Sequence, residues 1–252
     1  MSSGPATLRS VTSRAMAVLH AFDARHDRLG LSEISRRSGL SLTTTHRLVG
    51  ALTAHEALER RADGRYVIGR WIWELGLLAP VQHELRAVAR PFLQDLYDAT
   101  RENAHLAVLD GTEVLYVEHL SGRASVPLLS TAGSRLPLHA TGVGKVLLAH
   151  APQDLQETVL THLPAMTPRT IVGAARLRRE LAEVRRRGYA TTAEEMSLRT
   201  FSVAAPVMDI ERVVVAAVGV VTTTARRDLQ RLAPAVLVAA AGVSRSLGRS
   251  AP

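Results

Sequence analysis

Two short helical patterns follow each other within residues 31–55, separated only by a glycine turn, and this arrangement restricts the fold more than any other feature. The first pattern ends at Gly39, a residue type that readily adopts the left-handed conformation of a helix C-terminus. Ser41 can cap the second helix, whose apolar side chains, among them Leu48 and Leu52, recur at helical spacing. Two helices joined this closely predict a helix-turn-helix.

A basic hairpin is predicted directly after the second helix. The dipeptide Asp63-Gly64 lies between the strand-like runs 57–61 and 66–68, and Asp-Gly is a strong hairpin-turn signal. A hairpin in this position is typical of the wing of a DNA-binding domain. It places three arginines where backbone phosphates would lie: Arg60, Arg61 and Arg65.

The second helix begins with residue types suited to reading DNA. In a helix-turn-helix these first residues meet base edges in the major groove, where threonine and arginine side chains contact thymine and guanine. The alternative is a small helical bundle with a solvated arginine face. With the wing arginines, the DNA-contacting residues that we expect are Ser32, Arg36, Arg37, Ser41, Thr43, Thr44, Thr45, His46 and Arg47.

Charge supports a polyanionic partner only in part. The chain of 252 residues has a formal net charge of +8, and residues 1–70 contribute +5 of it, from 11 arginines and 6 acidic residues. A field of this sign suits nucleic acid but does not define a fold. Because the chain has a single lysine, Lys145, beside 30 arginines, its arginine richness is in itself weak evidence for DNA binding.

Three segments are expected along the chain: a DNA-binding domain over residues 1–70, linker helices over 71–90 and a larger domain over 91–252. The linker reads as two helical stretches, interrupted at Pro80 and ended by Pro91. Both tryptophans of the chain, at positions 71 and 73, fall in it. They are equally consistent with contacts between subunits and with packing on the wing domain.

The third segment is predicted to be an α+β domain with one antiparallel sheet, because strand-like runs at both its ends surround central helical stretches. The expected strands are 105–109, 114–119, 201–207 and 212–222; the expected helices are 144–149, 152–160, 177–187 and 228–247.

The glycine-rich turn before Lys145 is not a P-loop, since His139 stands at the position of the first glycine and Val146 follows the lysine. Its amides could still bind a small anion such as a carboxylate. Lys145 is either a ligand-binding ammonium or a group that bonds nearby carbonyls. Of the adjacent Glu194 and Glu195, which an extended segment would point to opposite faces, one is expected to form a structural ion pair.

Nothing in the sequence argues for catalysis. The chain has no cysteine, its ten histidines show no metal-ligand spacing, and no serine lies in a Gly-x-Ser-x-Gly elbow. We expect no cofactor. With no leader and no membrane-length apolar run, the protein is expected to be soluble and cytoplasmic.

The chain resembles the IclR family of bacterial transcriptional regulators over about residues 8–248. The similarity is carried by motifs in the family's order, which are Leu31-Ser32-Glu33-Ile34, Thr43-Thr44-Thr45-His46-Arg47-Leu48, Gly64-Arg65-Tyr66, Leu136-Pro137-Leu138-His139, Gly142-Val143-Gly144-Lys145, Thr167-Pro168-Arg169-Thr170, Glu194-Glu195 and Ala204-Ala205-Pro206-Val207. The resemblance implies a winged helix-turn-helix, a linker helix and a GAF-like effector-binding domain. It also implies a homodimer or homotetramer that binds double-stranded operator DNA under the control of a small-molecule effector, commonly a carboxylic acid or aromatic catabolite.

The effector residues implied by the resemblance are Leu138, His139, Gly142, Val143, Gly144, Lys145, Thr192, Glu194, Ser202, Gly219 and Val221. The chain departs from the family where Thr192 replaces a common Asp and where Gly219 and Val221 replace small polar residues. These changes disfavour a very small oxidised acid such as glyoxylate and favour a larger, less polar ligand. In the turn of the helix-turn-helix, Ser41-Leu42 replaces the usual Pro-Lys and removes one phosphate contact.

Two alternatives stay open beside a ligand-controlled regulator. The effector pocket could have lost its function, or the winged helix could bind a protein while the larger domain senses a small molecule. A salt titration separates DNA binding from the second alternative, because phosphate contacts make affinity fall steeply with salt. The sign of regulation stays open as well, since repressors and activators of the family share this architecture.

Overall fold

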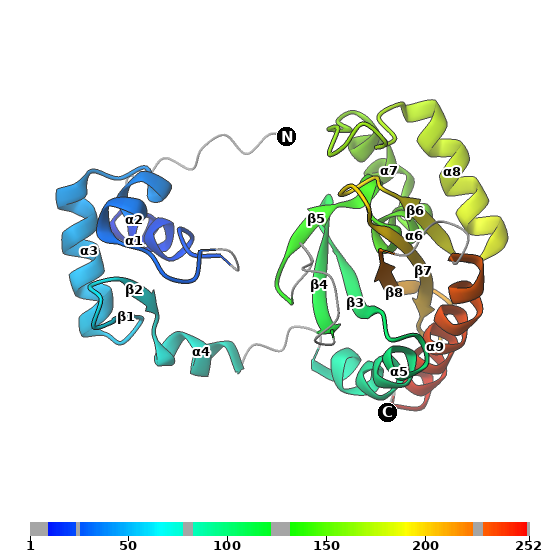
Figure 1. The fold of residues 1–252 in the computed structure, drawn as a ribbon, viewed down its shortest axis with the longest axis horizontal. Coiled ribbons are helices and arrows are strands. Elements are labelled where there is room, and N and C mark those ends of the chain that lie inside the picture. Colours follow the sequence, from blue (N-terminus) through cyan, green and yellow to red (C-terminus); the bar gives the residue numbers. More distant parts are fainter. Residues whose placement is uncertain (1–9, 24–25, 78–82, 122–131, 224–228, 251–252) are drawn as a thin grey trace. The chain divides into compact units, whose positions relative to one another are not determined.

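The computed structural model describes residues 10–23, 26–77, 83–121, 132–223 and 229–250, and the chain divides into two compact units at Val81/Gln82 (Figure 1). The elements of the first unit are α1 (Val11–Leu19), α2 (Leu31–Ser38), α3 (Leu42–Ala54), β1 (Leu58–Arg60), β2 (Tyr66–Ile68) and α4 (Arg70–Leu77). Those of the second unit are α5 (His83–Thr100), β3 (Asn103–Asp110), β4 (Glu113–Leu120), β5 (Arg135–Pro137), the 3₁₀ turn η1 (Leu138–Ala140), α6 (Gly142–His150), α7 (Gln153–Leu160), α8 (Ala174–Arg187), β6 (Ala190–Ala193), β7 (Phe201–Met208), β8 (Val214–Thr222) and α9 (Leu229–Ser250).

The first unit is the predicted winged helix-turn-helix. Helix α2 ends at Gly39, whose φ of 68° lies in the left-handed region, and the Ser41 side chain caps α3 by accepting a hydrogen bond from the Thr44 amide at 3.3 Å. The strands β1 and β2 pair antiparallel as the wing. A small apolar core joins these elements, and it contains Val18, Ala21, Leu29, Ile34, Leu48, Val49 and Leu58.

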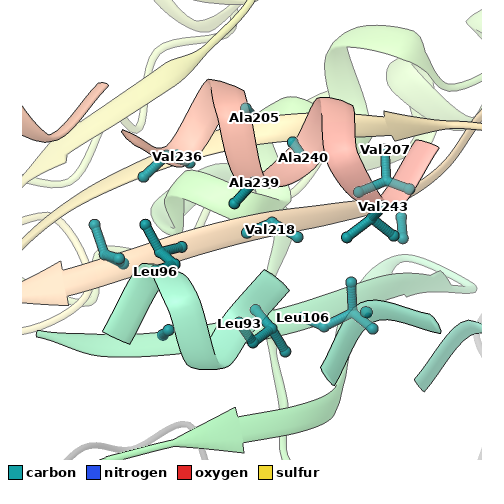
Figure 2. Packing of buried hydrophobic residues seen from close by; sticks show 14 of the residues in the cluster. Leu93, Leu96, Leu106, Ala205, Val207, Val218, Val236, Ala239, Ala240 and Val243 are labelled. Atoms are coloured by element: carbon teal, nitrogen blue, oxygen red, sulfur yellow. The ribbon is translucent and has the colours of Figure 1, made fainter. Parts of the chain in front are cut away.

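The second unit is built on a six-stranded sheet in the order β5-β4-β3-β8-β7-β6, in which every pair is antiparallel. Its two faces carry separate apolar cores. Helices α5 and α9 cover one face, where Leu93 and Leu96 meet Val218, Val236 and Val243 (Figure 2). Helix α6 covers the other face, with α8 packed against it. The predicted α+β domain with one antiparallel sheet is therefore confirmed.

One expectation about the elements of this unit is wrong, and two of its strands were not predicted. No helix ends at Pro91: α5 runs through it to Thr100, because Pro91 is exposed while Ala89 and Leu93 on either side of it are buried in the core. The sequence pattern also missed the edge strands β5 and β6, which have three and four residues and are too short for a clear alternation. The expected break at Pro80 lies outside the described residues.

A buried ion pair joins α6 to the segment between β6 and β7. The Lys145 Nζ donates a hydrogen bond to Glu195 Oε1 at 2.6 Å, and the Lys145 side chain is only 1% exposed. Burial raises the pKa of the Glu195 carboxyl, while the Lys145 ammonium acts in the opposite direction. Glu195 is thus the acid of the expected structural ion pair, and Lys145 bonds a carboxylate rather than backbone carbonyls. Glu194 does not lie on an extended segment, since its φ is 58°.

We expect Lys145→Met to lower the free energy of unfolding by about 3–5 kcal/mol, because it leaves the buried Glu195 carboxylate without its partner. Since the pKa of Glu195 is already raised by burial, this loss should shrink as the pH falls and the carboxyl binds a proton. Urea unfolding of both proteins across the acidic range measures the effect.

Arg178→Met is the matched control, because Arg178 pairs with Glu157 at the surface and both side chains are 51% exposed. Its cost should stay below about 1 kcal/mol. Equal losses for the two variants would contradict a structural role for the buried pair.

Candidate functional site

The N-terminal turns of α3 present a polar surface made of four exposed residues: Ser41, Thr43, His46 and Arg47. Thr44 is half-buried, and its hydroxyl accepts a hydrogen bond from the Ser41 hydroxyl at 2.9 Å. Thr45 is fully buried, and its hydroxyl donates to the Ser41 carbonyl at 3.0 Å. Thr45 therefore belongs to the core of this unit, and the expectation that its side chain contacts DNA is wrong for this conformation.

The expected DNA-contacting arginines fall into two groups. Arg36 and Arg47 are exposed and form no ion pair with any residue that the structure describes. The others have partners within the unit. Arg37 bonds the Ala21 carbonyl and Asp23, Arg60 lies 5.9 Å from the centre of the Tyr66 ring, Arg61 pairs with Glu59 at 2.7 Å, and Arg65 lies 3.9 Å from Glu33.

Ser32 is exposed at the first turn of α2. Together with Arg36 and Arg47 it gives the helix-turn-helix exposed donors that form no side-chain hydrogen bond with another described residue and can bind a phosphate or a base. Arg47 is the arginine of this set that lies on the helix expected to enter the major groove.

A cavity opens in the second unit between the sheet and the N-terminal end of α6. The cavity has a volume of about 40 Å³, and about 440 Å³ of space free of protein atoms, open solvent included, lies among its lining residues. Its lining residues are His105, Tyr116, Leu136, Ala140, Thr141, Gly142, Thr192, Met196, Ser197, Thr200, Phe201, Ser202 and Val221.

Four of the expected effector residues line this cavity: Gly142, Thr192, Ser202 and Val221. Strand register brings three of them together, because Thr192 pairs with Ser202 and Ser202 pairs with Val221 across adjacent strands. The Thr192 and Ser202 hydroxyls are hydrogen-bonded at 2.6 Å and form a polar wall.

The other expected effector residues do not line the cavity; they are Leu138, His139, Val143, Gly144, Lys145, Glu194 and Gly219. Each of the polar ones is engaged elsewhere: His139 Nε2 lies 3.0 Å from the Pro164 carbonyl, Lys145 pairs with Glu195, and Glu194 Oε1 accepts from the Arg199 amide at 2.9 Å. Leu138 and Val143, the latter on α6 itself, are buried in the apolar core on this face of the sheet.

The segment 194–200 covers one side of the cavity through Met196, Ser197 and Thr200. Two threonines fix its backbone: Thr167 donates to the Glu194 carbonyl at 2.6 Å, and Thr170 donates to the Glu195 carbonyl at 2.7 Å. Together with the Lys145–Glu195 pair, these bonds hold the segment against the body of the domain.

The interior of the cavity carries no charge. Burial lowers the pKa of His105 to about 3, so its imidazole is neutral, and burial also raises the pKa of the Tyr116 phenol. The remaining lining groups are apolar or hydroxyls, and the helix α6 begins at its wall with Thr141 and Gly142. Such a surface suits an apolar ligand that carries a few hydrogen-bonding groups.

The sequence reasoning missed the aromatic and histidine side chains of the cavity. His105 and Tyr116 lie in strands that were expected, and their ring centroids are 5.2 Å apart in an edge-to-face contact. The signal that could have identified His105 is a histidine inside a strand that is otherwise apolar on both faces.

Within the described residues, no group of three or more His, Asp or Glu side chains is placed to bind a metal ion. None of the described helices is long and apolar enough to cross a bilayer.

Both units of the chain match domain families of known proteins. Residues 11–62 match the IclR helix-turn-helix domain and residues 79–245 match the C-terminal domain of bacterial IclR transcriptional regulators. The transcriptional regulator XynR of Escherichia coli is 33% identical over 93% of this chain and 96% of its own length. The glycerol operon regulatory protein of Streptomyces coelicolor is 35% identical over 93% of this chain and 95% of its own length.

A similar solved structure is that of an IclR homologue from Microbacterium hydrocarbonoxydans in complex with 4-hydroxybenzoate. It superposes with a TM-score of 0.87 at 34% identity and covers 96% of this chain and all of its own. The relatives named here are regulators of transcription rather than enzymes. With a helix-turn-helix for DNA and a C-terminal domain for a small-molecule effector, the chain belongs to the IclR family of transcriptional regulators.

Proposed function

We propose that the protein binds a specific operator through α3 and the wing, and that an aromatic or similarly apolar carboxylic acid in the cavity changes this binding. The observation that carries the proposal is the uncharged, partly aromatic lining of the cavity beside the first turn of α6. Apolar walls suit an aromatic ring, and backbone amides at a helix N-terminus favour a carboxylate. The 4-hydroxybenzoate bound by the relative from Microbacterium hydrocarbonoxydans belongs to this ligand class.

The working form is proposed to be a homodimer or homotetramer. Trp71, Trp73 and Leu75 on α4 are 44%, 60% and 43% exposed, and large apolar side chains in contact with solvent favour association between copies of the chain. This exposure supports the first of the two roles considered for the tryptophans, contacts between subunits, over packing on the wing domain.

Arg47→Ala should weaken binding to an operator duplex selected in vitro by about 1–3 kcal/mol, because an arginine at this position of α3 can grip guanine with two hydrogen bonds. Binding to random-sequence DNA should change far less. Fluorescence anisotropy with both duplexes measures the difference.

Arg178→Ala on α8, an exposed arginine of the second unit, is the control and should leave both affinities unchanged. Equal losses of Arg47→Ala on both duplexes would show that Arg47 contacts only the phosphate backbone.

Thermal unfolding against a panel of aromatic acids, aliphatic acids and sugars tests the ligand class. A ligand that binds only the folded state raises stability by about 2.7 kcal/mol at a hundredfold excess over its Kd. We expect aromatic acids to raise the Tm.

Val221→Met should remove this shift, since it extends a side chain into the cavity, whereas the same substitution at the exposed Val213 should preserve it. No shift with any compound would contradict a working effector site and favour a pocket without function. A shift confined to sugars or aliphatic acids would overturn the aromatic class.

A further inference from the structure

Three polar side chains at the start of β3 and the end of β4 have buried atoms without a hydrogen-bond partner among the residues that the structure describes. They are both amide atoms of Asn103, Nδ1 of His105 and Nε2 of His119. Asn103 is 1% exposed and His105 is 2% exposed, so water does not reach these groups from the surface. A buried polar atom without a partner costs about 1–3 kcal/mol, and folded proteins contain few of them.

Strand register places all three on the face of the sheet that contains the cavity. His119 pairs with His105 across β4 and β3, and Asn103 pairs with Val221 across β3 and β8. Cross-strand partners project to the same face of a sheet. Because His105 and Val221 both line the cavity, Asn103 and His119 flank a cavity-lining side chain rather than facing the opposite core.

The residue of β8 that pairs with His105 is a glycine, so no side chain on that strand lies directly beside the imidazole. Its strand partner there is Gly219, where a Cβ atom would lie 3.1 Å from the His105 Nε2. The ring also contacts Tyr116 edge-to-face, which fixes its orientation. His105 is therefore positioned as firmly as a core residue although its Nδ1 has no partner.

The hydrogen-bonding properties of His105, His119 and Asn103 indicate which ligand groups could bind to them. Burial lowers the pKa of both histidines, which keeps the rings neutral, and a neutral imidazole has one donor and one acceptor nitrogen. The Asn103 amide likewise donates and accepts. The lysine of the chain cannot add a cation here, because Lys145 is paired with Glu195. A ligand group that suits these side chains is uncharged and can both donate and accept a hydrogen bond, as a hydroxyl does.

We propose that the His105 side chain, which lines the cavity, binds a hydroxyl group of the effector, with Asn103 and His119 beside it on the same face of the sheet. The inference rests on the proposed effector function and narrows it to a hydroxylated ligand. The aromatic ring of the ligand lies among the apolar lining residues, and its hydroxyl meets the His105 imidazole at the cavity wall.

Calorimetric titration of the full-length protein with benzoate, 3-hydroxybenzoate and 4-hydroxybenzoate tests the inference. We expect one hydroxylated acid to bind the native protein about tenfold more tightly than benzoate, as one well-placed hydrogen bond allows. His105→Phe keeps the ring packing on Tyr116 and removes both nitrogens. In this variant the ratio of the hydroxybenzoate and benzoate affinities should fall to about one.

A second measurement separates recognition from a structural role of the histidine. His105→Phe should leave the Tm of the free protein unchanged or higher, because it removes a buried atom without a partner. His139→Phe is the matched control at an equally buried histidine, and it should lower the Tm because it loses the bond to the Pro164 carbonyl.

Four results would overturn the inference. Equal affinities of all three acids for the native protein, or a preference that survives His105→Phe, would leave aromatic acids as effectors but place no hydroxyl at His105. A loss of Tm in His105→Phe as large as in His139→Phe would show that His105 is satisfied within the folded protein. If none of the three acids binds, both this inference and the proposed aromatic class fail.

Discussion

The pairing of β3 with β8 is the contact on which the second unit depends. It joins residues 103–107 to residues 217–221 at the centre of the six-stranded sheet, across more than half of the domain's length. Because both faces of the sheet are covered by helices, a slip of one residue would exchange the two apolar cores. The same register sets His105 beside Gly219 and Asn103 beside Val221, so the pairing that stabilises the domain also assembles the cavity.

The opposite wall of the cavity depends on electrostatics as well as packing. Lys145 lies in the first turn of α6, and its ion pair with Glu195 ties that turn to the segment carrying Met196 and Ser197. The ammonium is thereby removed from ligand binding, which leaves an uncharged interior. A lone lysine in an arginine-rich chain thus has a structural explanation in its compact head group, which donates to one carboxylate oxygen at 2.6 Å.

Local signals predicted the first unit well. Gly39, Ser41 and Asp63-Gly64 determine a helix end, a helix start and a hairpin turn through contacts with residues close to them in the sequence. Thr45 was misassigned although the signal was present: it shares helical spacing with Leu48, Val49 and Leu52, the residues expected on the buried face. The arginine partners were not predictable, since Arg37 meets Ala21 and Asp23 only through packing of the helices.

The cavity was predicted only where the family pattern marks it, at Gly142, Thr192, Ser202 and Val221. His105 and Tyr116 could be assigned to strands, but their meeting depends on a register that includes a β-bulge between Leu106 and Ala107. The continuation of α5 through Pro91 was hidden for a similar reason, because the burial of Ala89 and Leu93 outweighs a local helix-breaking signal.

If occupancy of the cavity and binding of DNA are coupled, each ligand must change the affinity for the other by the same factor, and this reciprocity can be measured directly. The measurement is the affinity of the intact protein for a hydroxybenzoate, with and without a saturating amount of the selected operator duplex. We expect the duplex to change the affinity for the hydroxybenzoate by the same factor by which the hydroxybenzoate changes the affinity for the operator. Identical ligand affinities for free and DNA-bound protein would contradict it.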